Sequence, residues 1–208
     1  MKELPILAAM TSGLEEADAL DPVVDRVYDI TSAVPRGVRE VLHGEPAGHT
    51  LHPAIILLPV GAWIGSAVLD FVPGAQKASR VLVGVGIAGV LPSVATGLAD
   101  WSTLRRDQSR VGLVHAASNT VATSLYALSF VQRGRGRTLS GRLLGLAGLA
   151  AVGLSGYLGG HLTYRMGASV EQLDPTVHTD ASGRLESAWR APLLTSTSSS
   201  EWRPSSPG

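Results

Sequence analysis

The chain of 208 residues contains no cysteine. This absence excludes disulfide bonds, thiolate metal sites and any iron–sulfur cluster that is ligated within the chain. An excess of positive charge is also missing, because 17 basic residues balance 17 acidic ones. A nucleic-acid partner therefore has no electrostatic support. The sequence has no phosphate-binding loop and no zinc-protease motif either, so it gives no reason to expect a hydrolase.

Charged side chains are nearly absent from four long stretches, over residues 52–71, 81–101, 111–131 and 143–164. Each stretch is close to the ~20 residues with which a helix crosses a hydrocarbon layer of about 30 Å. Trp101 and Tyr164 fall at span ends, where amphipathic rings prefer the membrane interface. The pattern predicts an all-α fold, a four-helix transmembrane bundle in a multi-pass membrane protein with both termini on one side.

The remaining charge divides the chain into three predicted parts. Residues 1–48 mix Val and Leu with Asp and Arg, which predicts an amphipathic helical segment on the membrane surface or over the mouth of the bundle. Residues 49–167 form the predicted transmembrane domain. Residues 168–208 are polar and become rich in Ser and Pro, which is typical of a disordered tail. Six Lys or Arg residues lie near the spans on each side, so the positive-inside rule gives no orientation.

A weak similarity relates the two halves of the predicted bundle at an offset of 63 residues. The offset pairs His52 with His115, Trp63 with Tyr126, Gly97 with Gly160, and Trp101 with Tyr164. A duplication would give two parallel helical hairpins whose first and third helices are diagonal to each other. His52 and His115 would then face the bundle centre at similar depth. Chance similarity is the alternative.

Polar side chains in the spans gather toward one membrane face, because the first and third helices start where the second and fourth end. The residues of this layer are His49, His52, Asp100, His115, Asn119, His161 and Tyr164. Polar groups inside a bilayer are costly and by default mark a site. Asp70 lies at the opposite face and is interpreted as a residue that ends the first helix.

The histidine layer has two chemical interpretations. Neutral imidazole is a common ligand of haem iron and of transition metals. Two histidines could ligate haem b axially, or three of them with Asp100 could hold a metal ion. Alternatively, the imidazoles hydrogen-bond Asp100, Asn119 and backbone carbonyls and so fix the register between helices. The residues alone leave both interpretations open.

Several long motifs resemble a known family. They are LHGEPAGHTLHPAIILLPVGAWIGSAVLD, TGLADW, VGLVHAASNTVATSLYA and GYLGGHLTYRMGASV. Together they resemble, over about residues 20–170, the bacterial membrane family called domain of unknown function 2231. The resemblance marks these residues as characteristic positions: His52, Asp70, Asp100, His115, Asn119, Gly159, Gly160 and His161.

The resemblance implies a four-helix protein of the bacterial plasma membrane with a connection to electron transfer, because many members continue into a Rieske iron–sulfur domain. This chain departs from that pattern, since it has no cysteine and ends in a Ser-rich tail. The resulting hypothesis is a redox component that binds haem b or interacts with quinone through His52, His115 and His161. Asp100, Asn119 and Tyr164 would support these ligands by hydrogen bonds. The alternatives are a membrane anchor or assembly factor for a soluble Rieske or ferredoxin-type partner, and a metal-ion transport or handling protein.

Overall fold

The computed structural model describes residues 5–168, and every regular element in that range is a helix. The predicted all-α class is therefore confirmed, whereas the predicted tail lies, apart from Ala168, outside the described residues. The helices are α1 (Pro5–Glu15), α2 (Asp21–Ser32), α3 (Arg36–His43), α4 (His52–Ile55), α5 (Leu57–Leu69), α6 (Gln76–Trp101), α7 (Arg106–Gly134) and α8 (Thr138–Tyr164). Two short 3-10 helices, η1 (Asp18–Leu20) and η2 (Glu45–Ala47), join the first of them.

The first predicted span is divided into α4 and α5, because Pro59 interrupts the hydrogen-bond ladder. Proline has no amide hydrogen, and its ring clashes with the carbonyl four residues earlier, which here belongs to Ile55. α4 ends at that residue, and α5 begins at Leu57. The two pieces together cover the length expected of one span. Pro92 lies inside α6, which continues without a break.

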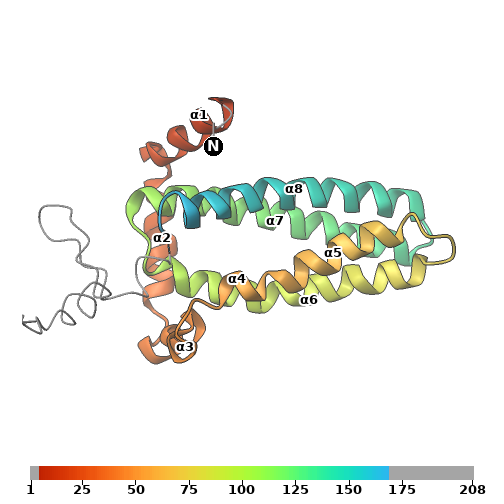
Figure 1. Ribbon diagram of the computed structural model, residues 1–208, viewed down its shortest axis with the longest axis horizontal. Coiled ribbons are helices and arrows are strands. Elements are labelled where there is room, and N and C mark those ends of the chain that lie inside the picture. The colour runs from red at the N-terminus through yellow and green to blue at the C-terminus, as the bar shows by residue number, and fades with distance from the viewer. Residues whose placement is uncertain (1–4, 169–208) are drawn as a thin grey trace, which may run out of the picture. The chain divides into compact units, whose positions relative to one another are not determined.

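The long helices form two hairpins, α4–α5 with α6 and α7 with α8, whose turns lie at the same end of the bundle (Figure 1). α5 packs against α6 and α8, and α7 packs against the same two helices. α5 and α7 are therefore diagonal, as the duplication predicts. The rings of Trp63 and Tyr126 meet across this diagonal, stacked with centroids 4.1 Å apart and planes 9° apart. Both rings are buried and form the middle of the core.

Three helical segments have the length and composition of membrane spans: His52–Leu69, α6 and α8. With 26 residues, α6 is about 39 Å long at ~1.5 Å per residue, which exceeds the ~30 Å hydrocarbon layer. Large apolar side chains such as Leu57, Leu91 and Leu139 cover the outside of these segments, as a lipid-facing surface requires. α7 is longer still but more polar, so the count of four spans stays a prediction.

We expect single cysteines to settle whether α7 crosses the membrane. Gln76→Cys is at the start of α6 and Arg137→Cys lies just before α8, both at the turns of the hairpins, and Ala33→Cys lies between α2 and α3. If α6 and α7 both cross, an impermeant thiol reagent will reach the first two positions from one side and Ala33→Cys from the other. The native chain, which has no cysteine, is the unlabelled control. Labelling of Gln76→Cys and Arg137→Cys from opposite sides would contradict the four-span topology.

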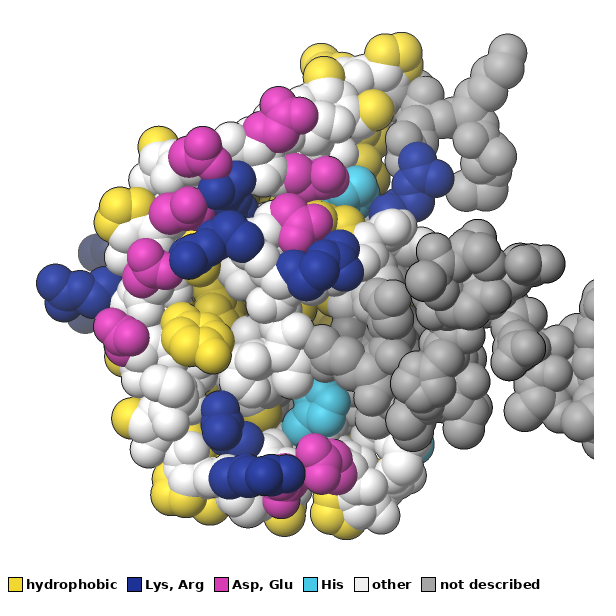
Figure 2. Space-filling model, turned by 90° about the vertical axis from the view of Figure 1, so that its left-hand side faces the viewer, with side chains coloured by type: hydrophobic (Ala, Val, Ile, Leu, Met, Phe, Trp, Pro, Cys, Tyr) yellow, Lys and Arg dark blue, Asp and Glu magenta, His cyan; other side chains and the backbone are white. Residues whose placement is uncertain are grey.

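The N-terminal helices flank the end of the bundle that is opposite the hairpin turns, and α2 lies across that end (Figure 1). Ion pairs hold it there: Arg110 donates to both carboxylate oxygens of Asp21, at 2.7 and 2.9 Å, and Arg106 pairs with Asp25. The Arg110 guanidinium lowers the pKa of Asp21, so the carboxylate stays charged and paired at neutral pH. Figure 2 shows acidic and basic side chains intermingled on this face.

Candidate functional site

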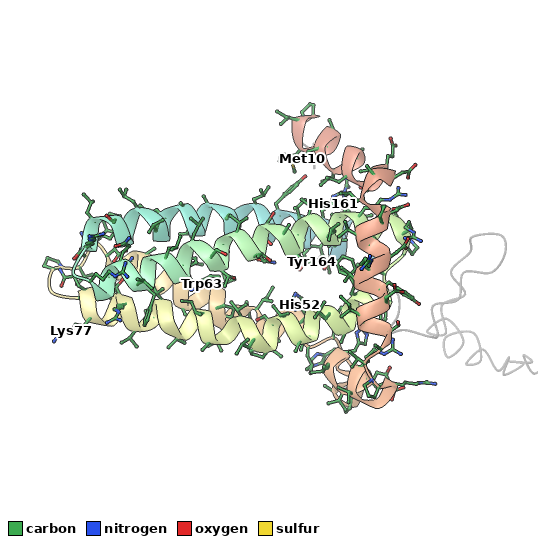
Figure 3. All side chains as sticks on the ribbon, turned by 180° about the vertical axis from the view of Figure 1, so that it is seen from behind. Met10, His52, Trp63, Lys77, His161 and Tyr164 are labelled. Atoms are coloured by element: carbon green, nitrogen blue, oxygen red, sulfur yellow. The ribbon has the colours of Figure 1, made fainter. Side chains whose placement is uncertain are left out.

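Two histidines occupy matching positions in the two hairpins. His52 is the first residue of α4, and its Nδ1 lies 3.0 Å from the Ser93 carbonyl oxygen of α6. His115 lies in α7, and its Nδ1 is 2.8 Å from the Ser155 carbonyl oxygen of α8. Figure 3 shows His52 on the side of its helix that faces the other hairpin. In each hairpin, one imidazole is therefore tied to the backbone of the partner helix.

A glycine makes room for each imidazole ring. A Cβ atom on Gly97 would lie 3.0 Å from Cε1 of His52, and one on Gly159 would lie 3.0 Å from Cε1 of His115. Such contacts are too tight for the ring to keep its place. The offset of 63 predicts Gly160 as the equivalent of Gly97. The contacts show that the equivalent is Gly159. Gly160 has only the Tyr164 ring of its own helix near it.

The same repeat extends along the bundle. Trp63 rests against Gly86, and Tyr126 rests against Gly148, where a side chain would overlap the ring in each case. The end of the bundle at which α5 turns into α6 and α7 turns into α8 is called the turn end. Asp70 and Arg133 lie there and are related by the same offset of 63 residues. The offset is 63 between α4–α5 and α7 but 62 between α6 and α8, so the second hairpin has one residue less in its connection. Repeated contacts at the histidines and at the aromatic rings, together with one contact between equivalent positions at the turns, support an internal duplication.

The hydrogen bonds at Nδ1 determine what each ring can do. A carbonyl oxygen can only accept, so Nδ1 of both rings carries the proton and Nε2 carries the lone pair. The Nε2 of His115 lies 3.1 Å from the amide nitrogen of Asn119, which donates to it. Each ring thus has one oriented lone pair, the form in which imidazole binds a metal.

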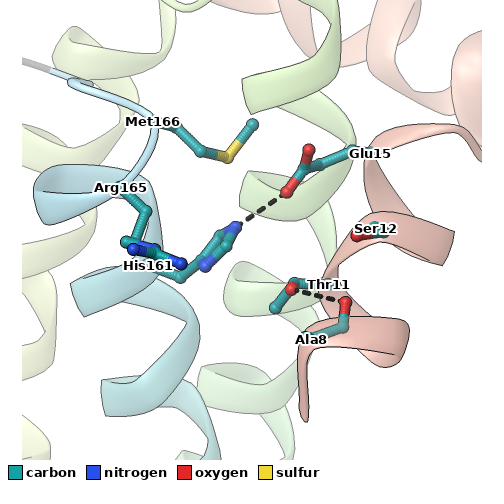
Figure 4. A pocket seen from close by; sticks show the side chains of 7 residues that line it. All are labelled: Ala8, Thr11, Ser12, Glu15, His161, Arg165 and Met166. Carbon is teal, nitrogen blue, oxygen red and sulfur yellow. Dashed lines mark hydrogen bonds and ion pairs between the residues drawn. The ribbon is translucent and has the colours of Figure 1, made fainter. Parts of the chain in front are cut away.

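His161 is separate from this pair. Its Nε2 lies 2.8 Å from a carboxylate oxygen of Glu15, which belongs to α1 (Figure 4). A pocket of about 250 Å³ lies beside this pair, between α1 and the end of α8. The pocket is lined by Ala8, Thr11, Ser12, Glu15, His161, Arg165 and Met166.

Asp100 is bonded to a histidine outside the predicted polar layer. Its carboxylate lies 2.8 Å from Nδ1 of His43, and both side chains are largely buried. Gly44, with φ of 108°, and Gly48, with φ of 72°, allow the chain to turn back after α3 and bring His43 to α6. His43 precedes the spans in sequence, so only the glycine-rich turn GEPAG that follows it could have indicated this approach.

The remaining predicted site residues are spread out. Tyr164 is 87% exposed at the end of α8 (Figure 3), and His49 is exposed and contacts only the neighbouring Thr50 carbonyl oxygen. Of the three residues expected to support the histidines, only Asn119 contacts one of them. Within residues 5–168, no group of three His, Asp or Glu side chains could hold a metal ion. The three-histidine site with Asp100 is therefore not assembled; it is replaced by separate pairs.

A second polar cluster lies at the turn end of the bundle. Arg133 donates to both carboxylate oxygens of Asp70, at 2.6 and 2.7 Å, and Ser79 donates to one of them at 2.7 Å. The side chains of Arg133 and Asp70 are only 3% and 9% exposed. Burial disfavours the charged carboxylate, but the hydrogen bonds from Arg133 and Ser79 prevail and lower the pKa of Asp70. Asp70 is therefore more than a helix-end residue, because it joins the two hairpins.

We expect Gly159→Leu to displace the His115 ring and to lower the thermal stability of the protein in detergent. In a membrane, close packing drives helix association, so a larger apolar side chain at a tight contact is no compensation. The matched control is Gly156→Leu in the same helix, where nothing lies within 4 Å of an added Cβ. Equal melting temperatures for the two variants would show that Gly159 tolerates a side chain.

A comparison with protein families agrees with this architecture. The family model described as "predicted membrane protein (DUF2231)" matches residues 48–172, well over half of the chain. No curated protein and no solved structure matches. The matched residues begin just before α4 and include all four long helices together with His52 and His115. The chain therefore belongs to the DUF2231 family of predicted membrane proteins.

Proposed function

We propose that this protein is a component of membrane electron transfer in which His52 and His115 bind haem b. The observation that supports it is the pair of imidazoles at equivalent positions of the two hairpins, each with Nδ1 bonded to a serine carbonyl. Haem iron in membrane redox proteins is held by axial ligands such as histidine, and it supplies one-electron transfer when bound. His52 and His115 would each offer the Nε2 lone pair to the haem iron, from two diagonal helices.

The surroundings of the two rings suit this role. A carbonyl that accepts the Nδ1 proton fixes the ring orientation and makes Nε2 a better electron donor. Gly97 and Gly159 let each ring pack directly against the partner helix, which holds the ring in place. Ligation would require the Asn119 amide to turn away from His115, since it now occupies that lone pair. His161 and Asp100 would keep their present partners, Glu15 and His43.

One observation favours the alternative of a non-catalytic anchor for a soluble Rieske or ferredoxin-type partner. Four histidines of this end already have protein partners: His43 with Asp100, His52 with Ser93, His115 with Ser155 and Asn119, and His161 with Glu15. In this case the imidazoles join helices, and the charged face formed by the N-terminal helices is the docking surface (Figure 2).

A visible absorption spectrum of the protein purified in mild detergent separates the two functions. The haem proposal expects a Soret band and a reduced-minus-oxidised band, with about one haem per chain by pyridine haemochrome assay. Metal analysis of the same sample should find iron in equal amount. A protein purified from haem-supplemented cells with neither chromophore nor iron would overturn the proposal, and the anchor would then be the better reading.

A further inference from the structure

The end of the bundle at which the two hairpins turn carries an excess of positive charge. Its basic residues come from the start of α6, the end of α7 and the region around the start of α8: Lys77, Arg80, Arg133, Arg135, Arg137 and Arg142. Asp70 is the only acidic residue between residues 53 and 99, and residues 108–164 contain none. Figure 3 shows Lys77 at this end, far from His52.

The single carboxylate does not neutralise this cluster. Asp70 is buried and already accepts two hydrogen bonds from Arg133, while Nε of Arg142 is 3.8 Å away. The Nε atoms of Arg142 and Arg80 are buried without a hydrogen-bond partner among the described residues. The Arg80 guanidinium lies over the Phe130 ring, 4.5 Å from its centroid. The cluster therefore keeps several cations without an acidic partner in the described part of the chain.

The opposite end is different, because its arginines are largely paired within the protein. Arg36 pairs with Glu40, Arg106 with Asp25, and Arg110 with Asp18 and Asp21. A simple count of Lys and Arg near the spans treats both ends alike. When the ion pairs are taken into account, the positive charge of the opposite end is largely neutralised. Among the described residues, the turn end then has the clear excess of positive charge.

We propose that the turn end of the bundle binds the headgroups of anionic phospholipids. The spans end there, so the cluster lies at the level of the lipid phosphates. Guanidinium groups bind phosphate oxygens through two parallel hydrogen bonds, and clustered Lys and Arg beside spans attract anionic lipids. Because the cytoplasmic leaflet carries the negative surface potential, the hairpin turns face the cytoplasm. The proposal is independent of haem binding at the other end.

Native mass spectrometry of the purified protein with added phosphatidylglycerol or phosphatidylcholine tests the binding. We expect the parent to retain several-fold more phosphatidylglycerol than phosphatidylcholine, and Lys77→Gln/Arg135→Gln/Arg137→Gln to lose that preference. These three side chains are exposed, so their replacement should not disturb the fold. The matched control, Arg26→Gln/Arg36→Gln/Arg106→Gln, removes three exposed arginines from the other end and should keep the preference. Equal retention of both lipids by the parent, or an unchanged preference in the first variant, would overturn the proposal.

Inorganic phosphate distinguishes a lipid headgroup site from a site for free anions. Millimolar phosphate should leave the retained phosphatidylglycerol unchanged, because the lipid also contacts the apolar sides of the helices. Displacement of the lipid by phosphate would contradict a lipid site. The orientation has its own test, since an impermeant thiol reagent added to intact cells should label Ala33→Cys but not Arg137→Cys. Labelling of Arg137→Cys alone would overturn the cytoplasmic placement of the turns.

Discussion

His115→Ala is expected to abolish the haem absorbance entirely, and His52→Ala to do the same, if these residues are the axial ligands. Each variant would leave the haem with one of its two protein ligands, and His43 and His161 at the same end are already bonded to carboxylates. The measurement is the reduced-minus-oxidised spectrum of each variant at equal protein concentration. His161→Ala should keep the band, because that ring is bonded to Glu15 and not to the His52–His115 pair.

Loss of fold is separated from loss of ligation by chemical rescue. His115→Gly leaves space for free imidazole, which should restore the band when it is added to the variant. His49→Ala is the neutral control, since His49 is exposed and contacts only its neighbour. A band that persists in both His52→Ala and His115→Ala would exclude this pair as the ligands.

Asp70→Leu is expected to destabilise the protein by about 3–5 kcal/mol, because it leaves the buried Arg133 charge without its partner. The side chain of Arg133 is only 3% exposed, so solvent cannot replace the lost carboxylate. The double variant Asp70→Leu/Arg133→Met removes both charges and should be more stable than the single variant. Denaturant unfolding in detergent, followed by circular dichroism, measures both effects.

Lys77→Leu is the control for this series, because it removes an exposed charge at the same end. Exposed charges contribute little to stability, so its unfolding curve should be close to that of the parent. If Asp70→Leu behaves like Lys77→Leu, the Arg133–Asp70 pair is hydrated and does not hold the hairpins together.

The long helices could be predicted from sequence because charge-free runs of about 20 residues have few other uses. The division of the first span at Pro59 was harder to predict from the sequence, since membrane helices often continue through proline, as α6 does at Pro92. The N-terminal helices could be predicted as amphipathic. Their place across the bundle end could not, because it depends on ion pairs such as Arg110–Asp21 between residues 89 positions apart.

The sequence predicts that the site residues lie at one end of the bundle. It does not predict which of them contact each other. Topology brings His52, His115, His161 and Asp100 to one end, but helix rotation decides which side chains meet. Asp100 is bonded to His43 of α3, and His161 is bonded to Glu15 of α1. Both partners belong to helices that precede the spans in the sequence. The offset of 63 gave the equivalence of His52 and His115. It missed Gly159 by one residue, because the second hairpin has a shorter connection.

The Asp70–Arg133 pair occupies equivalent positions of the two hairpins, yet the two residues have opposite charges. Two copies of one hairpin would bring together either two carboxylates or two guanidinium groups at this buried point, and both combinations repel. Each half is thus built to recognise the other half and to reject a second copy of itself. The pair therefore selects the combination of two unlike hairpins, whether they come from one chain or from two neighbouring chains.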